Sequence, residues 1–260
     1  MKDINRKIQF DNNESIKIKG IAIVLMVLLH AIYHAPKNVE VTYAFLPKNI
    51  VYNIAGMGKV CVSMFAFVSG YGLWKSYERK QNSSNKWTIG QLLKLLSKFW
   101  FVWIFTAIAC ELISGRSSHV YFQDGIIKGI LNIIIEMFGL ANLFHTPSLT
   151  GVYWYIGAAV FFVLCVPFLY YMKQNLAAAA LITILLPRIL AVGDNGFLGT
   201  MNPGSFLFVF ILGVISSEYE LIEKWTGTFQ FKGGKLIKLI LEILILCICY
   251  KIYYLFPVKS

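Results

Sequence analysis

The sequence predicts an all-α, polytopic transmembrane helix bundle of about seven or eight spans, with its N-terminus in the cytoplasm. Hydrophobic residues make up 57% of the 260 residues, charged residues only 14%, and the mean hydropathy is +0.64. Because a soluble domain keeps roughly a quarter of its residues charged, this chain has too few charges to cover a surface that faces water. The apolar residues also come in long runs, and about 20 apolar residues cross roughly 30 Å of hydrocarbon.

Seven apolar runs are predicted to be transmembrane helices. Lys59 interrupts the second run, so its buried part should begin near Val60. The first run ends at Pro36, and Lys173 follows the fourth. The predicted spans are residues 20–35, 51–74, 99–114, 153–172, 176–192, 205–216 and 239–257.

An eighth apolar segment, residues 126–144, allows two interpretations. It carries Lys128, Asn132, Glu136 and Asn142, which full exposure to hydrocarbon would leave unsatisfied. A re-entrant or interfacial segment is therefore favoured over a full crossing. Eight complete spans remain the alternative.

The distribution of basic residues predicts the orientation. Segments 1–19, 75–98, 173–175 and 217–238 hold 16 of the 24 basic residues and fit cytoplasmic loops, provided that 126–144 does not cross the membrane. Residues 1–18 are then a cytoplasmic segment, and 19–260 form one transmembrane domain. The net charge of +11 does not indicate nucleic-acid binding in this arrangement. It favours contact with the lipid bilayer or with a phosphorylated cofactor.

Two histidines in the first span are candidates for function. His30 and His34 lie four residues apart, so a helix places them on one face. Ionisable groups inside a membrane are costly and often functional. The alternative is that His34 sits at the outer boundary and His30 packs against a polar neighbour. No acidic motif accompanies the pair, and the cysteines lack a zinc-type spacing, so we expect no metal.

Lys19 shares the helix face of His30. The eleven residues between them amount to a rotation of roughly 20° beyond whole turns and a rise of about 16 Å. The first span thus presents a cation at the inner boundary and an imidazole deeper in the membrane. This arrangement suits a ligand with a phosphate head and a long arm.

Several short motifs resemble those of the membrane acyltransferase 3 family. The stretch 16–22, with Lys19 followed by Gly20, and then His30 are similar to the family's first helix. The matches follow the family order across about residues 16–216. The others are the aromatic-rich stretch 64–71 ending in Ser-Gly-Tyr, the basic pair Lys94 and Lys98, Trp154-Tyr155-Ile156, and the Phe-rich stretch 208–213.

The sequence departs from the family pattern at two places. Many members have a glutamate five residues after the tryptophan, and Ala159 stands there in this chain. The family also usually has about ten helices with a last segment rich in Ser and Tyr, and the sequence has no such segment before Ser260. We therefore expect a short member that lacks the usual last helices.

The resemblance implies a bacterial O-acyltransferase of the cell membrane. Such an enzyme transfers an acyl group, commonly acetyl, from cytoplasmic acyl-CoA to a hydroxyl of a surface polysaccharide or a lipid-linked sugar. Lys19, Lys94 and Lys98 would hold the CoA phosphates, and a neutral His30 would be the catalytic general base. Ser69, Trp154 and Tyr155 are candidate donors to the developing oxyanion.

Two further charges and one rival function belong to these expectations. Glu111 is a candidate to orient His30 or to pair with Arg188, and the simpler interpretation is a charge near the membrane interface. The rival function is a non-catalytic transporter or flippase of a glycan or lipid precursor. Transporters often contain inverted repeats with broken helices. We find no such repeat in the sequence.

Overall fold

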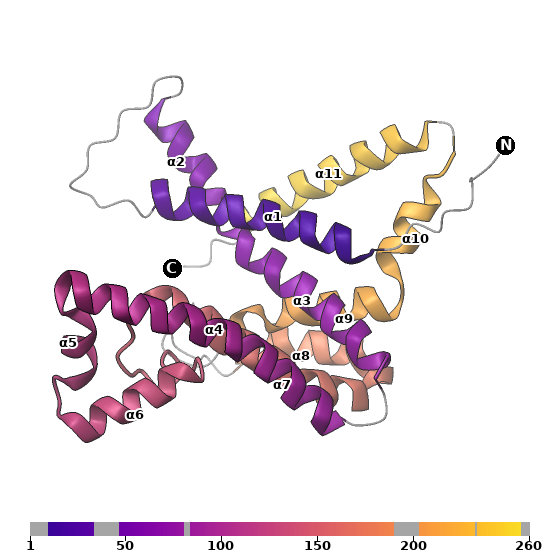
Figure 1. The fold of residues 1–260 in the computed structure, drawn as a ribbon. Helices are drawn as coiled ribbons and strands as arrows, with labels where there is room; N and C mark the ends of the chain where they lie inside the picture. The colour runs from indigo at the N-terminus through magenta and orange to yellow at the C-terminus, as the bar shows by residue number, and fades with distance from the viewer. Residues whose placement is uncertain (1–9, 34–46, 81–83, 190–202, 232, 256–260) are drawn as a thin grey trace.

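The computed structural model describes residues 10–33, 47–80, 84–189, 203–231 and 233–255, and every regular element among them is helical (Figure 1). The helices are α1 (Asn12–Leu28), η1 (Leu29–Tyr33), α2 (Lys48–Met57), α3 (Val60–Glu78), α4 (Ser84–Ser114), α5 (Arg116–Phe122), α6 (Ile126–Met137), η2 (Gly151–Tyr153), α7 (Trp154–Tyr171), η3 (Lys173–Asn175), α8 (Leu176–Ile189), η4 (Pro203–Phe206), α9 (Leu207–Glu218), α10 (Leu221–Thr228) and α11 (Gly234–Leu255).

Four stretches of the described residues are long and apolar enough to cross a membrane: 12–32, 48–78, 84–114 and 151–171. A fifth is added if α9 and α10, which meet at a 64° bend, count as one broken span. The chain is thus a multi-pass, all-helical membrane protein, while the predicted seven or eight spans are not confirmed. The break at Lys59 is confirmed, because α3 begins at Val60.

The basic stretch 75–98 is not a loop as predicted. Helix α3 runs to Glu78, and α4 begins at Ser84 and continues for 31 residues. Lys94 and Lys98 therefore lie well inside a helix, where leucines and other good helix formers surround them. At 1.5 Å per residue α4 is about 46 Å long, so its basic half extends beyond a hydrocarbon core of about 30 Å.

The segment 126–144 forms the short helix α6 and a series of turns. Twelve helical residues rise only about 18 Å, which is too short to cross the hydrocarbon core. Helix α6 packs against α5 and α4, and Figure 1 shows this group at the far end of α4 from the α3–α4 turn. The favoured prediction, that this segment is not a simple crossing, agrees with this geometry.

Helices α3 and α9 form the closest helix pair. A Cβ atom placed on Gly70 would lie 2.1 Å from the carbonyl oxygen of Phe210, and one on Gly213 would lie 2.1 Å from that of Phe67. The two glycines thus let the backbones touch in both directions, as small residues commonly do between membrane helices. The ring of Phe162 in α7 stacks on that of Phe210, with centroids 4.4 Å apart, so α7 belongs to the same buried cluster as α3 and α9.

An ion-pair network ties α3, η3 and α9 together near the end of α3. The Lys173 ammonium lies 2.9 Å from carboxylate oxygens of Glu78 and of Glu218, and the indole of Trp74 donates to Glu218 at 2.9 Å. The hydrogen bond to Glu78 raises the pKa of Lys173 against the opposing effect of burial. The network fixes the bundle at the end where the basic residues gather.

Candidate active site

A cavity of about 920 Å³ opens between α1, α3, α4 and α7. Its apolar lining includes Val68, Phe162 and Val163. Ala159, which stands where many family members have a glutamate, also lines the cavity. Six cations line the same cavity: Lys19, Lys75, Arg79, Lys80, Lys94 and Lys98. The cavity therefore combines apolar walls with six cations, against the single carboxylate of Asp11 in its lining.

Most of these cations have no charged partner. Among the described residues, only Lys75 of the six lies within ion-pair distance of a carboxylate, at 4.0 Å from Glu223. Glu223 also accepts hydrogen bonds from the Tyr71 hydroxyl at 2.6 Å and from the Phe10 backbone N–H at 3.2 Å. Unbalanced positive charge facing an open volume favours an anionic ligand.

The structure brings together four of the residues that the sequence singled out. Lys19 of α1, Lys94 and Lys98 of α4, and Ser69 of α3 all line the cavity. Lys94 and Lys98 are four residues apart in one helix, so they lie on one face of α4. Sequence reasoning missed Lys75, Arg79 and Lys80, although the i,i+4 spacing of Lys75 and Arg79 was a signal.

The three candidate oxyanion donors are neighbours. The side chain of Ser69 interacts with the hydroxyl of Tyr155 across the α3–α7 contact. Trp154 lies beside Tyr155, with ring centroids 5.8 Å apart, and stacks on Phe206 at 5.6 Å. Only Ser69 of the three lines the basic cavity. Trp154 instead borders a separate apolar pocket of about 130 Å³.

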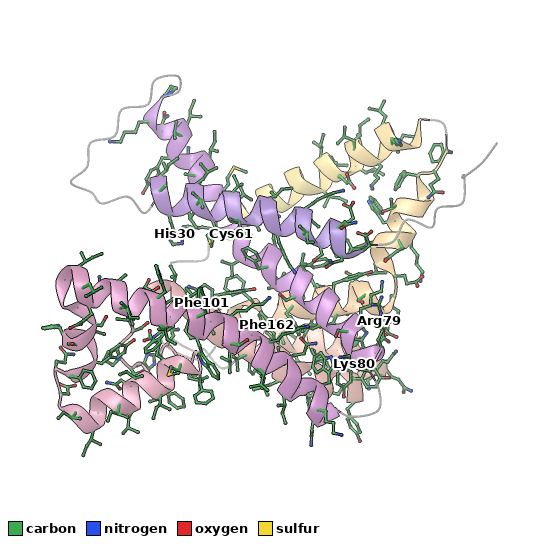
Figure 2. The ribbon with its side chains drawn as sticks, in the orientation of Figure 1. His30, Cys61, Arg79, Lys80, Phe101 and Phe162 are labelled. Atoms are coloured by element: carbon green, nitrogen blue, oxygen red, sulfur yellow. The ribbon has the colours of Figure 1, made fainter. Side chains whose placement is uncertain are left out.

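His30 lies outside the lining of the cavity. It is exposed and belongs to η1, a π-helical turn at the end of α1, which alters the register with Lys19 from that of a regular α-helix. Figure 2 shows His30 at the opposite side of the molecule from Arg79 and Lys80. His34 lies outside the described residues. The catalytic role of His30 stays a prediction.

Glu111 has a local partner in the structure. Its carboxylate accepts hydrogen bonds from the Ser118 backbone N–H at 2.8 Å and from the Ser118 hydroxyl at 2.6 Å. Ser118 lies in the first turn of α5, whose N–H groups have no partner inside the helix. Glu111 therefore caps α5. The side chain of Arg188 lies outside the described residues.

A fully buried carboxylate, Glu136 of α6, is the second polar centre of the molecule. It accepts hydrogen bonds from the Trp103 indole at 3.0 Å and the Leu149 backbone N–H at 3.1 Å, and from the hydroxyls of Tyr121 and Ser148. Burial and the bond to Glu136 raise the pKa of Tyr121. The sequence marked Glu136 as costly in hydrocarbon but gave no sign of these donors.

Comparison with known proteins identifies the family. The family model described as Acyltransferase domain matches residues 14–258. The chain belongs to the acyltransferase 3 family. Comparison with the curated proteins and with the solved structures found no match. The resemblance seen in the motifs is confirmed, and the cavity of this acyltransferase 3 protein lies within the matched range apart from residues 10–12.

Membership of the family makes acyl transfer the general activity of this acyltransferase 3 protein. Among the described residues, no three His, Cys, Asp or Glu side chains gather as metal ligands.

Proposed function

We propose that the protein transfers an acyl group, most simply acetyl, from cytoplasmic acyl-CoA to a hydroxyl of a surface polysaccharide or lipid-linked sugar. The carrying observation is the cavity whose lining combines six cations with apolar walls. CoA combines phosphates with a long uncharged arm, and this division of charge matches the cavity. The cavity would open to the cytoplasm in the predicted orientation, and the resemblance to the family supports a location in the cell membrane.

The cations of α1 and α4 would anchor the donor. Lys19, Lys94 and Lys98 present ammonium groups that bind phosphate as point charges. Their freedom from ion pairs among the described residues supports this role, because no internal carboxylate has to be displaced. The donor supplies an activated thioester, whose carbonyl carbon is the electrophile.

His30 would be the general base. A neutral imidazole nitrogen takes the proton of the acceptor hydroxyl while the hydroxyl oxygen bonds to the acyl carbon. The carbon–sulfur bond breaks, and the imidazolium returns the proton to the leaving thiolate. His30 lies about 16 Å beyond Lys19 along α1, so the arm of the donor must extend past the phosphate-binding end of the cavity.

Ser69 and Tyr155 would stabilise negative charge on the carbonyl oxygen. Both side chains carry hydroxyl donors and lie together between α3 and α7, and Ser69 reaches the cavity. Donors that are fixed before the reaction stabilise charge without reorganisation. A Ser69→Ala variant should then lose turnover with little change in donor affinity.

The test is acyl transfer from radiolabelled acetyl-CoA to membrane glycans. Wild type, His30→Ala, Lys19→Ala and an empty vector are compared at equal levels of inserted protein. We expect His30→Ala to abolish labelling and Lys19→Ala to weaken donor binding mainly. Lys86→Ala is the matched control for Lys19, because Lys86 is exposed on α4 and does not line the cavity.

Each role can fail separately. Labelling by His30→Ala at the wild-type rate would remove His30 as the base. Unchanged acetyl-CoA affinity in Lys19→Ala would remove the phosphate role. No labelling above the empty vector, together with uptake of a glycan precursor into proteoliposomes without acyl-CoA, would support the non-catalytic transporter instead.

A further inference from the structure

The register of the α3–α4 hairpin orders the cations of the cavity along its length. The Ser76 hydroxyl accepts hydrogen bonds from the side chains of Trp87 and Gln91, each at 3.2 Å. Ser76 is therefore level with the middle of the 87–91 turn. Since the helices run in opposite directions, residues after Gln91 in α4 lie deeper along the cavity, on a different wall from the residues that precede Ser76 in α3.

This register separates the cations into two tiers. Lys94 and Lys98 lie roughly 7 and 13 Å deeper than Ser76, at 1.5 Å per residue. Arg79 and Lys80 follow Ser76 at the end of α3, about 5 Å in the other direction. The separation between Arg79 and Lys94 along the helix axes is thus about 12 Å. Figure 2 shows Arg79 and Lys80 at the end of α3, far from His30.

Lys19 belongs to the deep tier. The Phe10 ring lies 4.6 Å from the ring of Tyr71, while the backbone oxygen of Leu25 closely approaches Gly58. Helix α1 thus runs antiparallel to α3. On that register Lys19 lies deeper than Tyr71, toward the end at which Lys98 sits. By the same rise per residue, Lys19 lies about 6 Å beyond Lys98 and about 12 Å beyond Lys94. Lys19 therefore extends the deep tier away from Arg79 and Lys80.

Arg79 and Lys80 form the outer tier of cations. Lys75 lies between the tiers. Its ammonium group pairs with the Glu223 carboxylate and donates a hydrogen bond to the Tyr71 hydroxyl oxygen at 3.3 Å. Arg79 and Lys80 have no carboxylate partner among the described residues. Arginine offers a planar fork that binds two phosphate oxygens at once, which a lysine ammonium does not. A basic residue that serves only to orient the protein in the membrane would need neither a planar guanidinium nor a position on the wall of a cavity.

We propose that Arg79, assisted by Lys80, forms a second phosphate subsite that binds the isolated 3′-phosphate of the CoA nucleotide, while Lys94 and Lys98, in the deep tier that Lys19 extends, bind its diphosphate. This inference rests on the proposed use of acyl-CoA. It assigns to α3 a nucleotide-specificity role beyond the basic motif of α4. The subsite distinguishes CoA from donors that carry only the diphosphate.

The test compares the affinities of CoA and of dephospho-CoA, which lacks the 3′-phosphate, for the purified full chain. The variants are Arg79→Ala, Arg79→Lys, Lys94→Ala and the control Lys86→Ala. We expect Arg79→Ala to weaken CoA binding about 10-fold and to leave dephospho-CoA within about two-fold, as the loss of a charged hydrogen-bond pair predicts. Arg79→Lys should fall between Arg79→Ala and wild type.

Lys94→Ala gives the contrasting pattern. It should weaken both ligands by a similar factor, because both carry the diphosphate. Equal losses for both ligands in Arg79→Ala, or no loss for either, would overturn the subsite while leaving donor binding intact. A wild-type protein that binds neither ligand would instead overturn the acyl-CoA donor itself, and with it this assignment.

Discussion

Helix α4 carries two polar centres that treat charge in opposite ways. On its basic half, Lys94 and Lys98 face an open cavity and have no carboxylate partner among the described residues. Five residues after Lys98, Trp103 donates to Glu136, a buried carboxylate that four donors satisfy. Buried charges are retained when they are fully hydrogen-bonded. The charge of Glu136 is therefore satisfied inside the protein, whereas the charges of Lys94 and Lys98 have no such internal partner among the described residues, as the proposed binding of an anionic donor requires.

The largest effect should follow from removing the satisfied charge. Glu136→Ala leaves buried donors without an acceptor, and each unsatisfied group costs roughly 1–3 kcal/mol, so we expect a loss of about 3–5 kcal/mol in unfolding free energy. Thermal unfolding in detergent, followed by tryptophan fluorescence, measures it. A Glu136→Ala protein as stable as wild type would contradict the comparison.

The next effect concerns the α3–α9 seam that supports the cavity wall. Gly70→Ala places a methyl group against the Phe210 carbonyl, so the helices must separate, at about 1–3 kcal/mol. Gly90→Ala in α4 is the control, because nothing lies within 4 Å of its added Cβ. The same unfolding assay should show a loss for Gly70→Ala alone. Equal midpoints for the two variants would rule out the close seam.

A cavity lysine should affect binding and leave stability unchanged. We expect Lys98→Ala to change unfolding free energy by less than about 0.5 kcal/mol, since no ion pair is broken. Its affinity for acetyl-CoA should fall about 10-fold, and the wild-type affinity should weaken at high salt. Isothermal titration at two salt concentrations measures both. A destabilised Lys98→Ala protein with normal affinity would reverse the contrast between the two centres.

The smallest effect belongs to Glu111. Its carboxylate is exposed, so Glu111→Ala should only increase hydrogen exchange at the first turn of α5, where Ser118 loses its acceptor. Acyl-CoA affinity should stay at the wild-type value. A large loss of activity in this variant would show that Glu111 acts on the reaction and not on α5 alone.

The sequence predicted the helical membrane class, the start of α3 and the shared position of Lys19, Lys94 and Lys98. The first two rest on local patterns, namely apolar runs and an interrupting charge. The third was implied by the resemblance to the acyltransferase 3 family. The helical nature of 75–98 was missed because clustered lysines are typical of loops between spans. In α4 the lysines instead belong to a helix that is longer than the hydrocarbon core is thick. The distribution of charge alone does not distinguish such a helix from a basic loop.

Features that depend on distant contacts were beyond the sequence. The four donors to Glu136 come from α4, α5 and the segment before η2, and no short motif links them. The role of Arg79 likewise appears only when the α3–α4 register is known. The π-helical turn at His30 alters the face that regular helical geometry predicted, and nothing in the local residues marks it.

Helix α1 carries Lys19, the η1 turn after it carries His30, and most of the surface of α1 faces away from the other helices. Ala22 is its only buried residue among those described, and just 11% of its apolar window is buried inside the protein. Segments with few buried contacts move at a lower free-energy cost than the core. Because α1 also contributes Lys19 to the lining of the basic cavity, the lipid packed around α1 should influence the proposed reaction.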